Sequence, residues 1–192
     1  IVAARLIAEG AIGRVVQTVG LGPHRLNRAI RPAWFFDTAT YGGILTDIGS
    51  HQAEQFLFYT RSTNAHVVAA QAGNLHWPDR PGFEDFGDMM VTGNGGTGYI
   101  RVDWYTPDGV PAWGDGRAFI LGTEGFIEQR KYMNLGTQDG PGHLFLANGQ
   151  EETHFQVSGK VGYPFFGELV LDCLERTENA MTQDHAFKAI EL

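Results

Sequence analysis

The chain has 192 residues, of which 43% are hydrophobic and 19% charged, as in an ordinary globular protein of about one domain. Its net charge is −8 and no cluster of lysine and arginine offsets that charge locally, which argues against a nucleic-acid partner. No apolar run approaches the roughly 18 residues of a membrane span, so we expect no membrane partner either. The single cysteine, Cys173, excludes an internal disulfide and fits a reducing, cytoplasmic location.

In chain order, the first expected element is a helix over residues 1–9, ended by Gly10, because glycine suits the left-handed conformation at a helix C-terminus. The β-branched run "RVVQTVG", residues 14–20, predicts a strand. Residues 22–41 show no clean period and carry prolines and aromatics, which is typical of a segment that lines a site or an interface. A helix over residues 43–59 is expected next.

Residues 65–157 predict a series of short strands joined by glycine-rich and Asn-Gly turns, and such a succession of hairpins implies a mostly antiparallel sheet. Residues 165–178 predict an amphipathic helix in which Cys173 is buried, and residues 184–192 again have helical periodicity. We therefore predict an α+β fold: an open, mostly antiparallel β-sheet with helices packed on one face. Both chain ends lie within apolar-periodic patterns, so we expect residues 1–192 to be a single domain and a fragment of a longer chain.

The segment "GGILTDIGSH", residues 42–51, places a carboxylate and an imidazole four residues apart. Residues at that spacing share one face of an α-helix, so Asp47, His51 and the nearby Glu54 are expected to form a polar stripe on a largely apolar helix. An aspartate one turn away could fix the tautomer of the imidazole and raise its pKa. A general acid/base that works near neutral pH needs both effects.

Two other interpretations of this spacing stay open. Asp47 could stabilise the first turns of the helix through the helix dipole, with His51 a hydrogen-bonded core residue. Alternatively, Asp47, His51 and Glu54 could ligate a divalent metal ion, although the spacing lacks the signature of a known metal-binding helix.

The segment "GNGGTG", residues 93–98, matches the G-x-G-x-x-G pattern of dinucleotide-binding turns. In that motif a helix must follow directly, because its N-terminus receives the pyrophosphate. Here the β-rich "YIRVDWY" follows instead, so we interpret the glycines as a turn between two strands. We expect no cofactor-binding residues in this chain.

Few residues outside these segments suggest chemistry. Trp34 and Phe35, next to Arg31, could stack on a sugar ring or could fill the core. The remaining histidines are scattered, and a surface or packing role is expected for each; they are His24, His66, His76, His143, His154 and His185.

The segment "RPAWFFDTATYGGILTDIGSHQAEQFLFYT", residues 31–60, resembles the hallmark segment of the glucose–fructose oxidoreductase, inositol dehydrogenase and rhizopine-catabolism (Gfo/Idh/MocA) family. The resemblance continues, in the order typical of the family, through "EGAIGRVV", "FEDFGDMMVTGNGGTGYI", "GTEGFIE" and "TQDHAFKAIEL". It implies the C-terminal α+β half of a two-domain oxidoreductase. The N-terminal Rossmann half of such enzymes, absent from this chain, binds the cofactor, NAD or NADP.

The resemblance also implies roles for individual residues. His51 would be the general acid/base that takes a proton from a substrate hydroxyl while hydride leaves the same carbon for the nicotinamide, and Asp47 would orient that imidazole. Arg31, Trp34 and Thr46 are implied to contact substrate, and no metal ligand is implied.

The resemblance further implies a sugar, cyclitol or related polyol as substrate. Sheets of relatives often pair across subunits, so a homodimer or homotetramer that forms through the sheet is expected. Some relatives act as regulators without turnover. The alternative function is therefore a non-catalytic sugar-sensing or oligomerisation module of the same fold.

Overall fold

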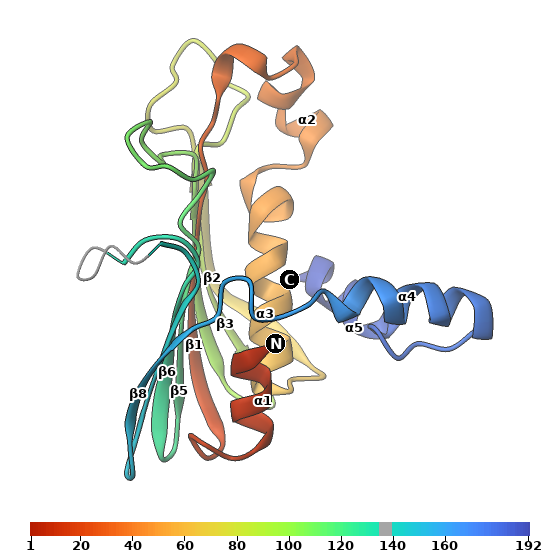
Figure 1. Ribbon diagram of the computed structural model, residues 1–192. Helices are drawn as coiled ribbons and strands as arrows, with labels where there is room; N and C mark the ends of the chain where they lie inside the picture. The colour runs from red at the N-terminus through yellow and green to blue at the C-terminus, as the bar shows by residue number, and fades with distance from the viewer. Residues whose placement is uncertain (135–139) are drawn as a thin grey trace.

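The computed structural model describes residues 1–134 and 140–192 (Figure 1). The strands of this part are β1 (Val15–Pro23), β2 (Ala65–Gly73), β3 (Phe86–Gly93), β4 (Thr97–Asp103), β5 (Arg117–Gly122), β6 (Gly125–Arg130), β7 (His143–Asn148) and β8 (Glu152–Gln156). They form an eight-stranded sheet with the order β2-β3-β4-β1-β5-β6-β7-β8. Neighbouring strands are antiparallel except β1 and β4, which run parallel. The predicted open, mostly antiparallel sheet is confirmed.

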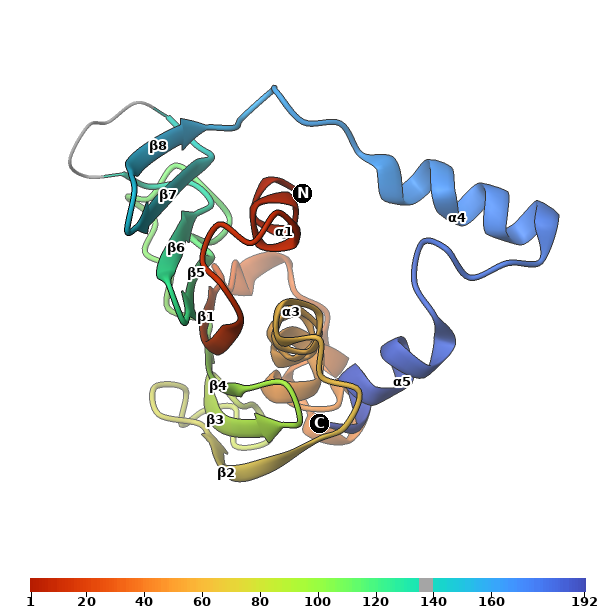
Figure 2. The ribbon, with the colours of Figure 1, turned by 90° about the horizontal axis from the view of Figure 1, so that it is seen from below.

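Helices cover one face of this sheet. The α-helices are α1 (Val2–Ala8), α2 (Thr38–Tyr41), α3 (Ser50–Thr60), α4 (Pro164–Glu175) and α5 (Gln183–Glu191). Two 3₁₀ turns, η1 (Arg28–Ile30) and η2 (Ala33–Phe36), and a π turn, η3 (Leu45–Gly49), lie in the segment before α3. In Figure 2, α1 and α3 lie side by side on the same side of the sheet. Within the described ranges, no helix has the length and apolar character that crossing a membrane requires.

Two apolar clusters fill the space between helices and sheet. In the first, Phe56 and Leu57 of α3 pack with Ile100 of β4 and residues of β3. In the second, Leu6 of α1 packs with Ile120 of β5 and residues of β6 and β7. Burial of each such side chain contributes about 1.5–3 kcal/mol before conformational entropy is counted, so both helices are fixed to the sheet.

The "GNGGTG" glycines form the hairpin between β3 and β4, as predicted. The amide of Gly93 donates to the carbonyl oxygen of Gly96 at 2.8 Å. A Cβ atom on Gly95 would lie 2.0 Å from the carbonyl oxygen of Thr60, at the end of α3. Glycine is therefore required here because α3 packs against the turn, and no helix follows that could receive a phosphate.

The opposite face of the sheet presents aromatic side chains, and no helix of residues 1–134 and 140–192 covers it. Residues that pair across neighbouring strands share a face, and the register pairs Val19 with both Tyr99 and Phe119. Phe119 stacks on Phe126, with ring centroids 5.1 Å apart. We call this surface the outer face; its apolar members are Val19, Leu21, Met90, Tyr99, Phe119, Leu121, Phe126 and Phe145.

The helix α4 projects away from the sheet and from the other helices in both ribbon views (Figures 1 and 2). Its predicted helical pattern is confirmed, but the prediction that Cys173 is buried is wrong, because Cys173 is exposed. The apolar periodicity that suggested a core position belongs to a surface that no other part of the described chain covers.

Candidate functional site

The "GGILTDIGSH" segment lies where the helix changes type. Asp47 belongs to the π turn η3, and His51 lies in the first turn of α3. The predicted continuous α-helix over residues 43–59 is therefore wrong for its first turn, because π winding contains an extra residue per turn. Single π turns are frequent at functional sites, since they re-aim the side chains of an otherwise regular helix.

Asp47 and three basic or titratable side chains influence one another. Partial burial of its carboxyl group raises the pKa of Asp47, whereas the neighbouring Arg31, His24 and His51 lower it. Burial also lowers the pKa of Arg31, and Asp47 opposes that change. The structure thus brings Arg31, Asp47 and His51 together, and it adds His24 to them.

The structure contradicts the His51 half of one of the two other interpretations of the motif. His51 is an exposed residue and, within the described chain, its ring makes no hydrogen bond, so it is not a hydrogen-bonded core histidine. Asp47 does lie in the first turn of η3, where the helix dipole favours a carboxylate. That effect is compatible with a further role for Asp47.

Glu54 is not part of this group. Its Oε1 lies 3.1 Å from Nε2 of His185, which fastens α5 to α3. Glu54, the third member of the expected stripe, therefore pairs with α5, and the electrostatic neighbours of Asp47 do not include it. Among the described residues, no three side chains of histidine, cysteine, aspartate or glutamate are placed to hold a metal ion.

His24 is the residue that reasoning from the sequence missed. Its Nδ1 lies 3.1 Å from the carbonyl oxygen of Gly22, and its ring meets Trp104 edge-on at 5.7 Å. Burial is the main cause that lowers the pKa of His24, and Lys131 and His51 lower it further. Its position directly after β1, in the irregular segment of residues 22–41 that also carries Arg31, was the available signal.

Arg31 is held in an aromatic cage. Its guanidinium carbon lies 4.2 Å from the ring centroid of Phe35, 4.9 Å from that of Trp104 and 5.1 Å from that of Trp113. Its Nε donates to the carbonyl oxygen of Leu26 at 3.0 Å. A guanidinium fixed in this way can present its remaining N–H groups to an oxygen-rich ligand at a low entropic cost.

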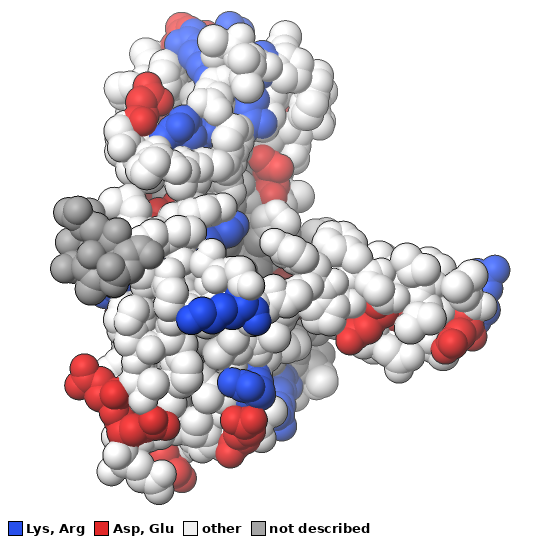
Figure 3. Space-filling model, in the orientation of Figure 1, with Lys and Arg blue, Asp and Glu red and all other residues white. Residues whose placement is uncertain are grey.

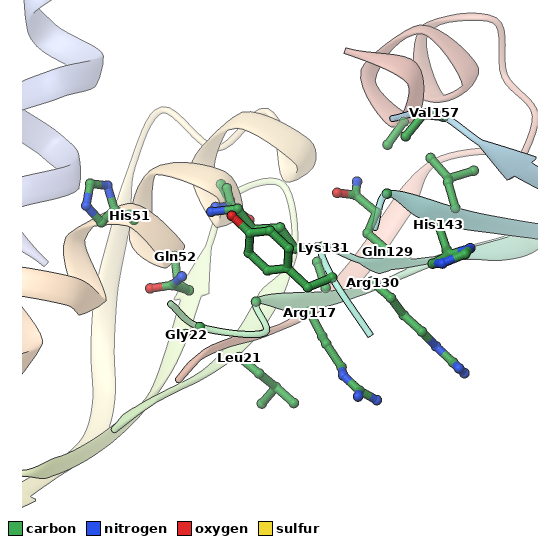
Figure 4. Close-up of a pocket in the computed structure, with 18 of the residues that line it drawn as sticks. Leu21, Gly22, His51, Gln52, Arg117, Gln129, Arg130, Lys131, His143 and Val157 are labelled. Carbon is green, nitrogen blue, oxygen red and sulfur yellow. The ribbon is translucent and has the colours of Figure 1, made fainter. Parts of the chain in front are cut away.

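His51 and His24 line a cavity of about 660 Å³ between the sheet and the helices α1 and α3. Figure 4 shows His51 at one edge of this cavity. This volume is in the range of small-molecule sites. Figure 4 shows Gln52 beside Gly22 in the cavity, whereas Arg117 and Arg130 point away from it. The polar residues that line it are His24, His51, Gln52, Gln55, Tyr59, Gln129 and Lys131.

Amide and hydroxyl groups give this cavity its polar character. Gln129 Nε2 donates to the Tyr59 hydroxyl oxygen at 3.0 Å, and burial raises the pKa of Tyr59. The Oε1 atom of Gln52 is buried without a hydrogen-bond partner in the described chain. Lys131 adds a positive charge, so the cavity suits a polar ligand that carries several hydroxyl groups.

The remaining two predicted substrate contacts lie elsewhere. Trp34 is 57% exposed and meets Phe35 edge-on, with ring centroids 6.0 Å apart. Thr46 is exposed in η3, one residue before Asp47. Neither residue lines the 660 Å³ cavity, nor do Arg31 and Asp47, and the roles of all four residues stay predictions.

A family model described as the GFO/IDH/MocA C-terminal domain matches residues 2–128. Among proteins with curated descriptions, none matches this chain. Among solved structures, the chain is similar to a proposed oxidoreductase from Erwinia carotovora atroseptica SCRI1043, with 55% identity and a TM-score of 0.95. That match covers 100% of this chain and 57% of the relative, so the chain spans little more than half the relative's length.

More distant structures share the fold. The aldose-aldose oxidoreductase from Caulobacter crescentus, complexed with glycerol, is 18% identical with a TM-score of 0.71, and the match covers 98% of this chain and 54% of that one. A levoglucosan dehydrogenase in complex with NADH is 17% identical with a TM-score of 0.69, and the match covers 97% of this chain and 57% of that one.

Proposed function

Because the chain belongs to the Gfo/Idh/MocA family of oxidoreductases, we propose that it is the C-terminal catalytic half of a longer NAD(P)-dependent enzyme. That enzyme would transfer hydride between a hydroxyl-bearing carbon of a sugar or cyclitol and a nicotinamide. One observation carries this proposal: His51 lies at the edge of a polar cavity, within electrostatic reach of Asp47 and His24.

The chemistry proposed for this chain is proton transfer. When a hydroxyl group is oxidised, its proton must leave as hydride departs from the same carbon, and an imidazole titrates in the right range to accept that proton. His51 is exposed and free to receive it. The carboxylate of Asp47 lies within electrostatic reach of His51, so it can stabilise the positive charge that develops on the ring in the transition state.

The cofactor supplies the hydride acceptor. The G-x-G-x-x-G segment of this chain is a β-hairpin, so these residues offer no phosphate-binding turn of that kind. The dinucleotide would therefore be held by the part of the enzyme that precedes this half. The amide groups of Gln52 and Gln129 line the cavity. The nicotinamide and the hydroxyl-bearing carbon of the substrate would meet in this cavity.

A polyol substrate is supported by the groups around the site. Gln52, Gln129 and Lys131 can donate hydrogen bonds to hydroxyl oxygens, and Trp113 offers an aromatic wall. Arg31, in its aromatic cage, lies close enough to Asp47 to interact with its carboxylate. It would bind a second part of the ligand. In this proposal Trp34 and Thr46, which do not line the cavity, contact the part of the substrate that extends beyond it.

The outer face would join subunits into a homodimer or homotetramer. Met90 is 54% exposed there, and the stacked rings of Phe119 and Phe126 lie at its centre. A broad apolar surface of this kind is unusual on a protein that functions alone. Sheet-to-sheet packing across a symmetry axis would cover the same surface on both subunits.

The test uses the full-length product of the gene that encodes this chain. Binding of NADH and NADPH is measured by fluorescence, and turnover is followed at the nicotinamide absorbance band with a panel of sugars, cyclitols and linear polyols. The proposal predicts cofactor binding and turnover with at least one member of the panel. Cofactor binding without any turnover would indicate a sensing module, and the absence of cofactor binding would overturn the proposal.

A further inference from the structure

The helix α4 presents an apolar face that nothing in the described chain covers. At about 100° per residue, six of its side chains fall within an arc of about 180°. Leu174, at one edge of this arc, is 75% exposed. We call this surface the α4 face; its members are Phe165, Phe166, Leu169, Val170, Cys173 and Leu174. The opposite side of the helix carries Glu168 and Glu175 together with the exposed Leu171. Figure 3 shows acidic atoms on the otherwise mostly uncharged surface around the projecting helix α4.

This helix is held at its far end by a built turn. The carboxylate of Asp172 accepts hydrogen bonds from the Thr177 hydroxyl at 2.6 Å and from the amides of Asn179 and Ala180 at 2.9 and 2.8 Å. These bonds lower the pKa of Asp172. They turn the chain back toward α5, so the turn after α4 has a defined structure. We call α4 together with this turn, residues 164–182, the arm.

The arm begins and ends on the domain. Val157 and Val161, which lead into α4, line the cavity that His51 borders. Beyond the turn, α5 returns to α3 through the Glu54–His185 contact, and Ala189 is buried in the first apolar cluster. The α4 face therefore extends a surface that starts at the rim of the proposed catalytic cavity.

We propose that the α4 face packs against the cofactor-binding half of the same enzyme and holds that half over the cavity. This inference rests on the proposed function, which places the cofactor in the part that precedes this chain. The Erwinia relative matches this chain throughout, and a large part of it has no counterpart here. The corresponding additional part of the longer protein would be the domain that packs on the α4 face.

The position of the arm favours this occupant over a second copy of the chain. Figures 1 and 2 show α4 extending on the helix-covered side of the sheet, opposite the outer face that would join subunits. Six apolar side chains on one helix suit an inter-domain contact, which typically buries about 600–1,500 Å². A domain seated on α4 would lie beside the cavity, where the cofactor must reach.

Cys173 is the reporter for the test, because it lies within the α4 face and is exposed when that face is bare. Full-length protein is treated with N-ethylmaleimide, natively and in urea, and modification of the Cys173 peptide is followed by mass spectrometry. Packing of α4 predicts labelling that is slower by about 100-fold or more in the native protein. Native labelling as fast as labelling in urea would overturn the proposal.

Two comparisons identify the occupant. Val170→Lys, on the α4 face, is expected to restore rapid labelling of Cys173, whereas Glu168→Lys, on the opposite side of the same helix, is expected to leave it slow. Should Val170→Lys fail to fold, amide hydrogen exchange across α4 in the unmodified protein gives the same information. Protection that disappears when the protein is diluted to monomers would assign the α4 face to a second copy and overturn the proposal.

Neither labelling nor exchange depends on turnover. A protected Cys173 in a protein that oxidises no polyol would leave this inference standing while the proposed activity failed. Rapid labelling of Cys173 in an active dehydrogenase would overturn this inference and leave the proposed activity standing.

Discussion

The side-chain amide of Gln52 lies flat against Gly22, so that a Cβ atom on Gly22 would be 2.8 Å from Nε2 and 2.9 Å from Oε1 of Gln52. A Cβ atom on Gly20, on the same face of β1, would lie 3.1 Å from Cγ of Gln52. Because glycines leave this part of the strand without side chains, the first turn of α3 can approach the sheet closely. His51, the residue before Gln52, is thereby set at the cavity edge.

The first prediction concerns Gly22→Ala. The added methyl group must displace the Gln52 amide, which is the far end of a flexible side chain and can move at little cost in stability. We therefore expect a nearly unchanged melting temperature but a turnover rate that falls by about tenfold or more, because the displaced amide enters the site. Gly73→Ala is the matched control, since nothing lies within 4 Å of a Cβ atom there. Equal effects of the two substitutions would contradict the account.

The second prediction concerns Asp47→Asn and pH. Burial raises the pKa of Asp47 above its ordinary value of 3.8, even with the attraction of Arg31 included. A raised pKa means that Asp47 favours folding below pH 3.8 and that this contribution is lost as the pH rises through the folded-state pKa. At pH 7 the ionised carboxylate is therefore a small cost to stability, because Asp47 is an exposed residue and solvent screens much of the effect.

Asp47→Asn should accordingly melt at a higher temperature than the unmodified protein at pH 7, with the difference shrinking as the pH falls toward 4. Turnover should fall, because the amide no longer favours the His51 imidazolium. Thermal melts over this pH range, together with rates, test both statements. A melting temperature below that of the unmodified protein at every pH would show that the carboxylate is structural.

The third prediction concerns the outer face. Phe119→Asp places a charge in the aromatic centre of the proposed subunit contact, so the dissociation constant of the oligomer should rise by about 100-fold or more. Light scattering over a range of concentrations measures this constant. Leu75→Asp, at a residue that is 71% exposed outside the strands, is the control and should leave the mass unchanged. An unchanged mass for Phe119→Asp would remove the outer face as the contact.

Much of the fold was predictable because the signals are local. Alternating runs such as that of β4 (Thr97–Asp103) bury every second residue whatever surrounds them. The "GNGGTG" segment was recognised as a hairpin because the residues that follow it are β-rich. The α-helical pattern likewise gave α3 and α4, apart from their ends.

The features that were missed depend on distant parts of the chain. A π turn over Leu45–Gly49 gives almost the same apolar pattern as one turn of α-helix. The spacing of apolar residues in the sequence therefore could not reveal it. His24 joins Asp47 only through the path of the irregular segment between them. Glu54 pairs with His185, which is 131 residues away. An apolar face such as that of α4 gives the same pattern whether its partner lies within the chain or outside it.

The most direct test of the central claim is the turnover number of full-length His51→Ala on a polyol that the unmodified enzyme oxidises. Loss of a general base costs about 10²–10⁴-fold. We therefore predict a fall in kcat of about 100-fold or more, with unchanged affinity for the nicotinamide cofactor and an unchanged melting temperature. A His51→Ala enzyme that keeps the turnover number of the unmodified protein would show that the proton leaves by another route.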